Sequence, residues 1–231
     1  VRPNYDAILI GNESANYIQP DGGNDQLRGL GGSDDLRGEL GNDVYVYGPA
    51  DNDPLAVDSI LDAAGRGQDR FDFTAFTQGV HADLATNTIR TADRMRIIAQ
   101  GKVENAKSVC EIEDLTGSRW QDFLLGNNLA NVLRGGGGDD VFWGGTAGND
   151  SLQGEIGDDL YYVTERGANL GQVRLIEQSG QGQDTLDFTY FAALGMPIRS
   201  MGNQVFSRQT SQLLATLEGN SGYFEQWHGA L

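Results

Sequence analysis

A nine-residue unit recurs in this chain, and its spacing constrains the fold more than any other feature. In Gly135–Trp143 the unit reads G-G-x-G-x-D-x-U-x, where U is a large apolar residue. Glycine adopts backbone angles that are closed to other residues, so the first six residues can form a tight turn. The last three residues form a short strand in which Phe142 points inward while Val141 and Trp143 point outward. The sequence therefore predicts one turn and one short strand per unit.

A first array of units runs without a slip, and the sixth position of each unit is Asp or Asn. The units are Gly11–Gln19, Pro20–Arg28, Gly29–Arg37 and Gly38–Val46, with Asn16, Asp25, Asp34 and Asp43 at the sixth position. The register lapses over residues 47–63, where Pro49, Asp51, Asn52, Asp53 and Pro54 indicate a loop. An EF-hand starting at Asp51 is disfavoured, because Ala56 stands where that loop needs glycine. The pattern returns as Gly65-x-Gly67-x-Asp69-x-Phe71.

A second array repeats this organisation further along the chain. Its units are Gly117–Leu125, Gly126–Arg134, Gly135–Trp143, Gly144–Gln153 and Gly154–Tyr162, with Asp122, Asn131, Asp140, Asp150 and Asp159 at the sixth position. The fourth of these units has one extra residue near Thr146. After a second lapse over residues 163–178 comes Gly180-x-Gly182-x-Asp184-x-Leu186.

The two halves of the chain resemble each other as wholes. Asp43 and Asp159 lie 116 residues apart, and Gly65 and Gly180 lie 115 apart, which indicates an internal duplication. Helical periodicity is faint throughout, so we expect an all-β solenoid. The expected organisation is a first array with its interrupting loop (11–74), connecting strands (75–116), a second array (117–189) and a C-terminal capping or appended segment (190–231).

The sixth-position side chains are the candidate metal ligands. Aspartate and turn carbonyls supply the hard oxygen atoms that Ca²⁺ prefers. Two aspartates stacked about 5 Å apart repel each other by a few kcal/mol at intermediate dielectric, and a cation would supply the missing charge. The alternative is a β-solenoid with metal-free Gly-Asp turns. The candidate ligands are Asn16, Asp25, Asp34, Asp43, Asp69, Asp122, Asn131, Asp140, Asp150, Asp159 and Asp184.

The nonapeptides resemble the RTX, or haemolysin-type, calcium-binding repeats, most specifically in Gly29–Val46 and Gly135–Tyr162. The resemblance implies a parallel β-roll with two units per turn and rows of Ca²⁺ ions along the turns. It pairs Asn16 with Asp34, Asp25 with Asp43, Asp122 with Asp140, Asn131 with Asp150, and Asp140 with Asp159. Asp140 is then the one aspartate expected to serve two ions. Sites at Asn16 and Asn131 are expected to be weaker, and the turns in which Ser14, Trp120 and Leu129 replace glycine are expected to be distorted or metal-free.

The resemblance also implies a module of a secreted bacterial protein, exported by type I secretion. Such a module stays unfolded at low cytosolic Ca²⁺ and folds on binding Ca²⁺ outside the cell. The chain starts at Val1 without a signal-like segment, so we expect a piece of a longer protein whose export signal lies elsewhere. The alternatives are a carbohydrate-binding (polyuronate-binding) accessory module of a polysaccharide-modifying enzyme and a structural spacer of an adhesin.

Composition narrows the function classes. The net charge of −17 argues against generic binding to nucleic acid or to an anionic membrane. Asp outnumbers Glu by 23 to 10, which favours turns and metal loops over acidic helices. The single cysteine, Cys110, excludes an internal disulfide and a cysteine-based zinc site. No run of apolar residues is long enough for a membrane helix.

No catalytic motif stands out. The two histidines, His81 and His228, do not form H-E-x-x-H, and G-x-S-x-G is absent, since the segment around Ser221 lacks its second glycine. A pairing of Ser221 with His228 is interpreted as a coincidence. We therefore expect a non-catalytic module.

Two surface features remain open. The outward positions of three second-array units are all apolar: Phe123, Leu125, Val141, Trp143, Leu160 and Tyr162. Either residues 163–178 or 190–231 cover them, or they form an aromatic platform for a glycan or a protein. On the opposite face the outward residues are Val132, Arg134, Ser151 and Gln153, which suit solvent. A basic cluster, Arg90, Arg94, Arg96, Lys102 and Lys107, is either a solvated hairpin or a grip on a polyanion.

Overall fold

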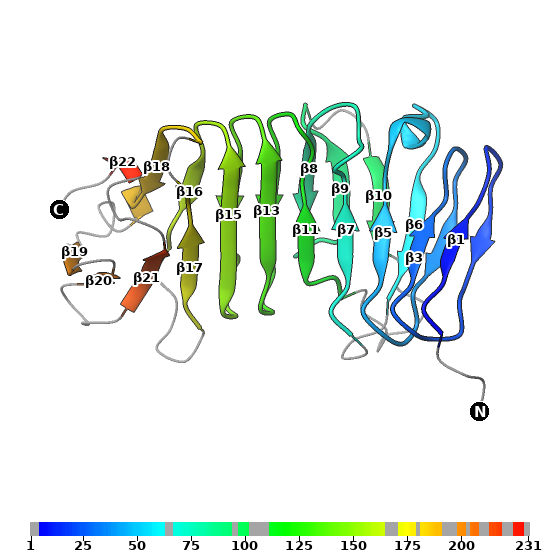
Figure 1. Ribbon diagram of the computed structural model, residues 1–231, viewed down its shortest axis with the longest axis horizontal. Helices are drawn as coiled ribbons and strands as arrows, with labels where there is room; N and C mark the ends of the chain where they lie inside the picture. Colours follow the sequence, from blue (N-terminus) through cyan, green and yellow to red (C-terminus); the bar gives the residue numbers. More distant parts are fainter. Residues whose placement is uncertain are drawn as a thin grey trace.

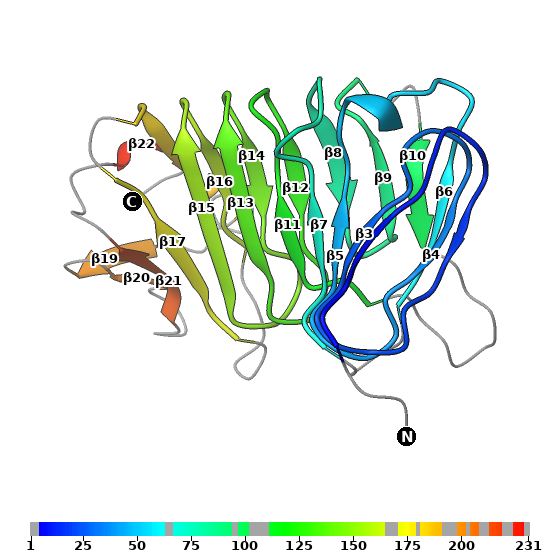
Figure 2. The same ribbon diagram turned by 45° about the vertical axis from the view of Figure 1, so that its right-hand side comes forward.

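Two long β-sheets face each other along the molecule, and the chain alternates between them (Figures 1 and 2). The computed structural model describes residues 5–62, 67–93, 97–101, 111–164, 171–178, 181–190, 198–201, 204–207, 213–218 and 224–228. The strands of the described residues are two to seven residues long, and a short 3₁₀ helix, η1 (Pro49–Asp51), lies between β5 (Val44–Val46) and β6 (Asp58–Leu61). No helix in the described part of the chain is long and apolar enough to cross a membrane.

In the described residues, the first sheet contains eleven strands, nine of which follow the chain from the N-terminus in parallel. In spatial order they are β1 (Ile8–Ile10), β3 (Gln26–Arg28), β5 (Val44–Val46), β7 (Arg70–Asp72), β11 (Asp114–Thr116), β13 (Val132–Gly137), β15 (Asp150–Ile156), β17 (Val173–Ile176), β21 (Leu213–Glu218), β20 (Gln204–Ser207) and β19 (Ile198–Met201). Strands β21, β20 and β19 pair antiparallel to one another at one end of this sheet.

The second sheet likewise contains eleven of the described strands. In spatial order they are β2 (Tyr17–Ile18), β4 (Asp35–Arg37), β6 (Asp58–Leu61), β10 (Ile97–Gly101), β9 (Thr88–Thr91), β8 (Val80–Asp83), β12 (Phe123–Leu125), β14 (Val141–Trp143), β16 (Leu160–Tyr162), β18 (Asp184–Asp187) and β22 (Phe224–His228). Within the two arrays the strands are parallel, so successive units alternate between the sheets and two units complete one turn. The predicted parallel β-roll is confirmed.

The core is a single column of the middle residues of the strands. Leu27 pairs with Tyr45 in the first sheet, and Phe142 pairs with Tyr161 in the second. All four side chains are fully buried, as the alternating pattern predicts. The rings of Phe142 and Tyr161 stack with centroids 5.0 Å apart. Each turn therefore contributes one apolar layer from each sheet.

The structure corrects the predicted loop over residues 47–63. Within it lies β6, which pairs with β4 in the second sheet and buries Ile60 completely. The lapse over 163–178 likewise contains β17, which pairs with β15. Both interruptions lengthen a turn without removing a strand from the roll. The extra residue near Thr146 is also absorbed in a turn, because Leu133 and Leu152 remain in register.

The predicted connecting strands form a hairpin insert in the second sheet. Strand β10 lies parallel to β6, β9 runs antiparallel between β10 and β8, and β8 lies parallel to β12. In the first sheet β7 pairs directly with β11. The two arrays are therefore continuous through the first sheet and separated by three strands in the second.

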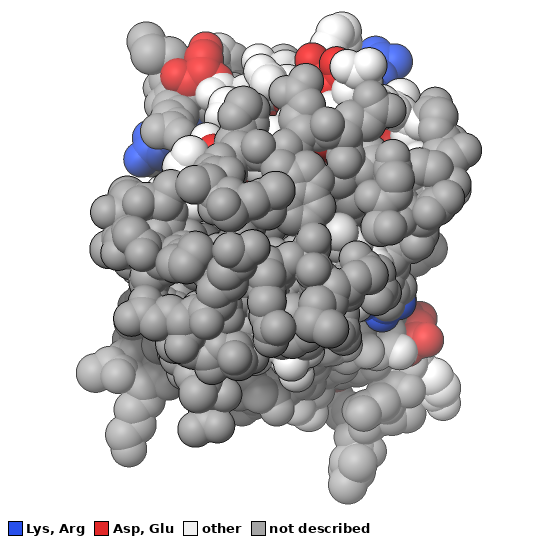
Figure 3. Space-filling model, turned by 90° about the vertical axis from the view of Figure 1, so that its left-hand side faces the viewer, with Lys and Arg blue, Asp and Glu red and all other residues white. Residues whose placement is uncertain are grey.

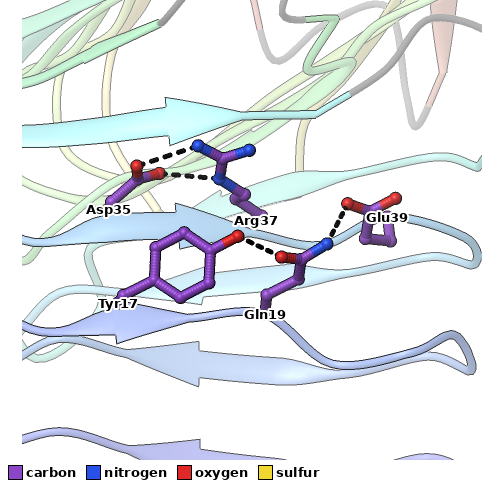
Figure 4. Close-up of polar contacts among 5 residues, drawn as sticks. All are labelled: Tyr17, Gln19, Asp35, Arg37 and Glu39. Atoms are coloured by element: carbon purple, nitrogen blue, oxygen red, sulfur yellow. Dashed lines mark hydrogen bonds and ion pairs between the residues drawn. The ribbon is translucent and has the colours of Figure 1, made fainter.

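The outer face of the second sheet differs between the two arrays. In the first array it is polar: Arg37 pairs with Asp35 at 3.0 Å and lies over the ring of Tyr17, while Gln19 bridges Tyr17 and Glu39 (Figure 4). In the second array, Phe123, Val141 and Leu160 form one row and Leu125, Trp143 and Tyr162 form another. These six side chains share one face as predicted and are partly exposed, Tyr162 by 40%.

The C-terminal strands continue the roll for a further turn. Strand β21 pairs with β17, and β22 pairs with β18, both in parallel. Figure 3 looks onto this end of the molecule, where the described acidic side chains lie mainly along one rim. Most residues of 190–231 lie outside the described part of the chain, so their proposed capping role stays a prediction.

Candidate metal centre

The sixth-position residues form a ladder of hydrogen bonds along each edge of the roll. Each of these residues immediately precedes or begins a strand, and one carboxylate oxygen accepts the backbone N–H of the sixth-position residue one turn earlier. The N–H groups of Asp25 and Asp43 donate to Asp43 and Asp69 at 2.7 and 2.8 Å. On the other edge, Asp122, Asp140 and Asp159 donate in turn to Asp140, Asp159 and Asp184, at 2.7, 2.8 and 3.1 Å.

These bonds place the pairs suggested by the sequence in adjacent turns. Asn16 donates to Asp34 at 2.8 Å, and Asn131 donates to Asp150 at 2.9 Å. Asp140 is not alone in having an acid in the turn on each side, because Asp43 lies between Asp25 and Asp69, and Asp159 lies between Asp140 and Asp184. That Asp140 serves two ions stays a prediction.

In five of these carboxylates the second oxygen has no hydrogen-bond partner among the described residues. The Oδ2 atoms concerned are buried and accept no hydrogen bond; they belong to Asp25, Asp34, Asp43, Asp140 and Asp159. In Gly29–Arg37 this atom lies against the first glycine, where a Cβ on Gly29 would be 2.0 Å from Asp34 Oδ2. A buried, unpaired carboxylate oxygen is costly unless a cation binds it. The turns therefore fit Ca²⁺, which takes several oxygen ligands from carboxylates and backbone.

Electrostatics support the same conclusion. Burial, followed by the charge of Asp122, raises the pKa of Asp140 to about 9. Burial raises the pKa of Asp159 to about 8 and that of Asp43 to about 6, with the charge of a neighbouring carboxylate adding to each. A raised carboxyl pKa means that the ionised form is disfavoured. A bound divalent cation would reverse this, because it favours ionised ligands.

Three turns satisfy their own polar groups. In the units that start at Gly11, Gly117 and Gly126, the second residue is Asn or Ser, and its side chain accepts the N–H of the fourth residue at 2.8–3.0 Å. In the last of these units, Asn131 accepts from Asn127 N–H and donates to Glu113 O and Asn127 Oδ1. Asp122 accepts from Val80 and from Ser118. We call these the capped turns.

The capped turns contain the three departures from glycine. The described non-glycine residues with positive φ are Leu30, Glu39, Asn87 and Glu155, so Ser14, Trp120 and Leu129 adopt ordinary φ values. Since the sixth-position side chains of two capped turns, Asp122 and Asn131, are already hydrogen-bonded on both polar atoms, these turns have less need of a cation than the others. The metal ligation of all eleven candidate residues remains a prediction.

Two ladder residues were missed in the sequence. Asp58 Oδ1 accepts the N–H of Asp34 at 2.9 Å, and Glu113 Oε2 accepts the N–H of Asp69 at 2.8 Å. Both side chains are buried. Neither residue belongs to a glycine-rich unit, so the spacing rule could not find them. The signal available was an acid directly before or at the start of an alternating strand pattern.

Most of the basic cluster and two other residues singled out in the sequence lie outside the described residues. Arg90 lies on β9, whereas Arg94, Arg96, Lys102 and Lys107 lie outside the described residues, as does Cys110. His81 is largely buried and stacks on Phe123, with ring centroids 5.8 Å apart. Ser221 is also outside the described residues.

Comparison with known proteins agrees with this geometry. The family model of the RTX calcium-binding nonapeptide repeat matches residues 8–52, 125–159 and 145–164, in four copies. These units are RTX calcium-binding repeats. The match covers part of each array, and the repeats imply Ca²⁺ binding.

No curated protein matches the chain at a significant level. Among solved structures, the chain is similar to the extracellular lipase LipA from Serratia marcescens, at 14% sequence identity and a TM-score of 0.25. That alignment covers 97% of this chain but only 39% of the lipase chain. The fold assignment rests on the strand pairing and not on this likeness.

Proposed function

We propose that the chain is a non-catalytic calcium-binding β-roll module of a secreted bacterial protein and that it folds on binding Ca²⁺ outside the cell. The observation that carries the proposal is the row of buried Oδ2 atoms without a partner, at Asp25, Asp34, Asp43, Asp140 and Asp159. Repeats of the calcium-binding family supply these residues.

Calcium dependence of folding follows from the spacing of the carboxylates. Each turn brings a further buried acid into line, so the cost of folding without a cation grows along the ladder. Binding energy at sites that exist only in the folded chain becomes folding energy. Low cytosolic Ca²⁺ would keep the chain unfolded, and the millimolar Ca²⁺ outside cells suits weak oxygen sites.

Circular dichroism and thermal melting with and without Ca²⁺ test this function. We expect high strand content and a cooperative melt in millimolar Ca²⁺, and a large fall in strand content and in melting temperature in excess chelator. Mg²⁺ at the same concentration is the control, since it prefers a smaller, octahedral and partly hydrated site. Equal strand content and an equal melting temperature in Ca²⁺ and in chelator would refute the proposal.

A carbohydrate ligand is the second candidate function, supported by the outer face of the second array. Trp143 borders a shallow groove of about 340 Å³, which Leu84, Asn87, Glu111 and Asn127 also line. A partly exposed indole beside amide groups suits the apolar face and the hydroxyls of a sugar. Glu111 in the groove disfavours the polyuronate class, because it would repel an acidic chain.

Affinity electrophoresis in gels containing neutral or acidic polysaccharides, with Ca²⁺ present, tests the second candidate. Retardation in a neutral gel that Trp143→Ala abolishes, with the melting temperature unchanged, is the expected result. A large loss of stability in Trp143→Ala, with no ligand retained by either protein, would instead show that the indole packs against the chain itself.

A further inference from the structure

Two clusters of three carboxylates occur at equivalent places in the two halves of the chain. The first contains Asp43, Asp62 and Asp69, and the second contains Asp159, Glu177 and Asp184. In each cluster one oxygen atom from every residue lies within 4.8 Å of the others. Corresponding members are 116, 115 and 115 residues apart, so the duplication has kept the whole arrangement.

The middle member of each cluster comes from an interruption of the repeat. Asp62 follows β6, and Glu177 follows β17. Their side chains are only 1% and 2% exposed. Asp62 Oδ1 and Glu177 Oε2 accept no hydrogen bond, nor do the neighbouring Oδ2 atoms of Asp43 and Asp159. Two unpartnered, buried carboxylate oxygens thus face each cluster, which is costly unless a cation lies between them.

A tyrosine hydroxyl fixes the added carboxylate in both clusters. Tyr45 Oη donates to Asp62 Oδ2 at 2.6 Å and accepts the N–H of Gly38 at 2.8 Å. In the second cluster Tyr161 Oη donates to Glu177 Oε1, which also accepts the N–H of Gly154 at 3.2 Å. Tyr45 and Tyr161 occupy the inward position, where most nonapeptide strands carry Leu, Ile or Phe. A phenol can reach from the core to the edge of the roll, whereas an aliphatic side chain offers no donor.

The floor of each cluster has no room for a side chain. A Cβ on Gly38 would lie 2.3 Å from Asp43 Oδ2 and 2.6 Å from Asp62 Oδ2. A Cβ on Gly154 would lie 1.9 Å from Asp159 Oδ2 and 2.5 Å from Tyr161 Oη. Glycine at the first position therefore makes room for the oxygen atoms of the cluster.

The dimensions and charge of the clusters fit Ca²⁺. Calcium–oxygen distances of about 2.3–2.6 Å put two ligands on opposite sides of the ion about 5 Å apart, so oxygen atoms that all lie within 4.8 Å of one another can share one ion. Three carboxylates supply more negative charge than one dication neutralises, and the phenol and backbone N–H groups spread the excess.

We propose that each cluster is a calcium site distinct from the turn-to-turn sites, and that the interruption supplies a ligand which the nonapeptides lack. The proposal rests on the proposed function, because it requires the calcium-loaded roll. In this arrangement the ion joins the end of a lengthened turn to two successive ladder aspartates. The ion thus holds each lengthened turn to the neighbouring turns, which keeps β6 and β17 in the sheets although the repeat is broken.

Charge-neutral variants of the full chain test the proposal with Ca²⁺ as the probe. Glu177→Gln and Asp62→Asn keep the side-chain size and remove one charge each. Native mass spectrometry would count bound ions, and melting would be followed in Ca²⁺ and in chelator. Glu13→Gln, which removes a charge from an exposed first-array turn, is the matched control. Tyr161→Phe removes only the hydroxyl that holds Glu177.

We expect Glu177→Gln and Asp62→Asn each to lose one ion, and their double variant to lose two, relative to the wild type. Tyr161→Phe should weaken one site at least about tenfold, the lower range for removal of a group that orients a ligand. Each charge-neutral variant should melt lower than the wild type in Ca²⁺ and no lower in chelator, where it relieves repulsion. If Asp62 and Glu177 stabilised the fold without binding an ion, their variants would melt lower than the wild type both in Ca²⁺ and in chelator.

Separate outcomes identify which idea fails. If the wild type binds no Ca²⁺, the proposed function fails and the cluster proposal fails with it. If the wild type binds Ca²⁺ and folds with it, while both charge-neutral variants keep the same ion count and melting temperature, the roll stands and the cluster sites are refuted. If a charge-neutral variant fails to fold even in Ca²⁺, the test rests on Tyr161→Phe. An unchanged ion affinity in Tyr161→Phe also refutes the proposal.

Discussion

The two oxygen atoms of a sixth-position aspartate in this roll have different roles. In Asp140, Oδ1 accepts the N–H of Asp122, while Oδ2 is buried without a partner in the protein. Asparagine can keep the first interaction but presents an amide nitrogen in place of the second oxygen. At this scale, the difference between Asp and Asn separates a structural hydrogen bond from a candidate metal ligand.

Asp140→Asn should therefore impair calcium-dependent folding more than Asp25→Asn or Asp150→Asn. Asp140 has an acid in the turn on each side, Asp122 and Asp159, whereas Asp150 faces the neutral Asn131 on one side. We expect the Ca²⁺ concentration at the folding midpoint to rise at least about tenfold for Asp140→Asn. Asp25→Asn and Asp150→Asn should raise this Ca²⁺ concentration less.

A titration of Ca²⁺ followed by circular dichroism gives these midpoints. Asp43→Asn serves as a second test, because Asp43 also lies between two acids, Asp25 and Asp69. Equal midpoints for Asp140→Asn and Asp150→Asn would show that neighbouring charge does not set the strength of a site.

At the scale of the turn, glycine at the fourth position of a unit is required by the turn beneath it. A Cβ on Gly41 would lie 1.7 Å from the carbonyl oxygen of Gly23, and one on Gly67 would lie 1.6 Å from that of Gly41. The residues that replace glycine here are Ser14, Trp120 and Leu129, and no nonapeptide turn lies beneath theirs. Stacking, and not only the tight turn, explains where glycine is needed.

Gly41→Ala should lower the free energy of unfolding by about 3 kcal/mol or more, since it adds a backbone clash to a left-handed φ of 125°. Ser14→Ala is the matched control at the same position of the first unit, where the side chain is exposed, and should stay within about 0.5 kcal/mol. Denaturant unfolding in saturating Ca²⁺ measures both. Similar losses in the two variants would contradict the stacking explanation.

The sequence predicts the elements wherever spacing alone determines them. The inward residues Leu27, Leu36, Tyr45 and Phe142 are all buried, because period nine leaves only one register for them. Strands β6 and β17 and the partner acids Asp58 and Glu113 could not be predicted, since they lie where the spacing is broken. Their place is decided by pairing with strands already in the sheet, which is a non-local effect. The side-chain hydrogen bonds of the capped turns also depend on geometry that the spacing does not encode.

For the whole molecule, the metal-free fold should depend on pH in the opposite sense to the loaded fold. The folded-state pKa values of Asp122, Asp140 and Asp159, about 7, 9 and 8, are raised above the ordinary 3.8 by burial. The folded metal-free chain thus holds these protons more tightly than the unfolded chain. This stabilisation is complete below about pH 4 and is lost as the pH rises through 7 to 9.

After removal of metal on a chelating resin, the chain should melt higher at pH 5 than at pH 8. In saturating Ca²⁺ the order should reverse, because the ligands must lose their protons to bind the ion. Thermal melts at the two pH values, each with and without Ca²⁺, provide the measurement. A metal-free chain that melts higher at pH 8 would show that these carboxyl groups are not the dominant titrating groups.

The hairpin insert makes the two sheets unequal in their number of strands. Between β7 and β11 the first sheet advances by one strand, whereas the second sheet needs four steps to pass from β6 to β12. An uninterrupted roll would need two steps, so the second sheet has two extra strands there, about 10 Å at the usual strand spacing. The acids that precede the first-sheet strands continue across this point, because Glu113 accepts the N–H of Asp69. The acids that precede the second-sheet strands are separated there, because three strands lie between the strand of Asp58 and that of Asp122.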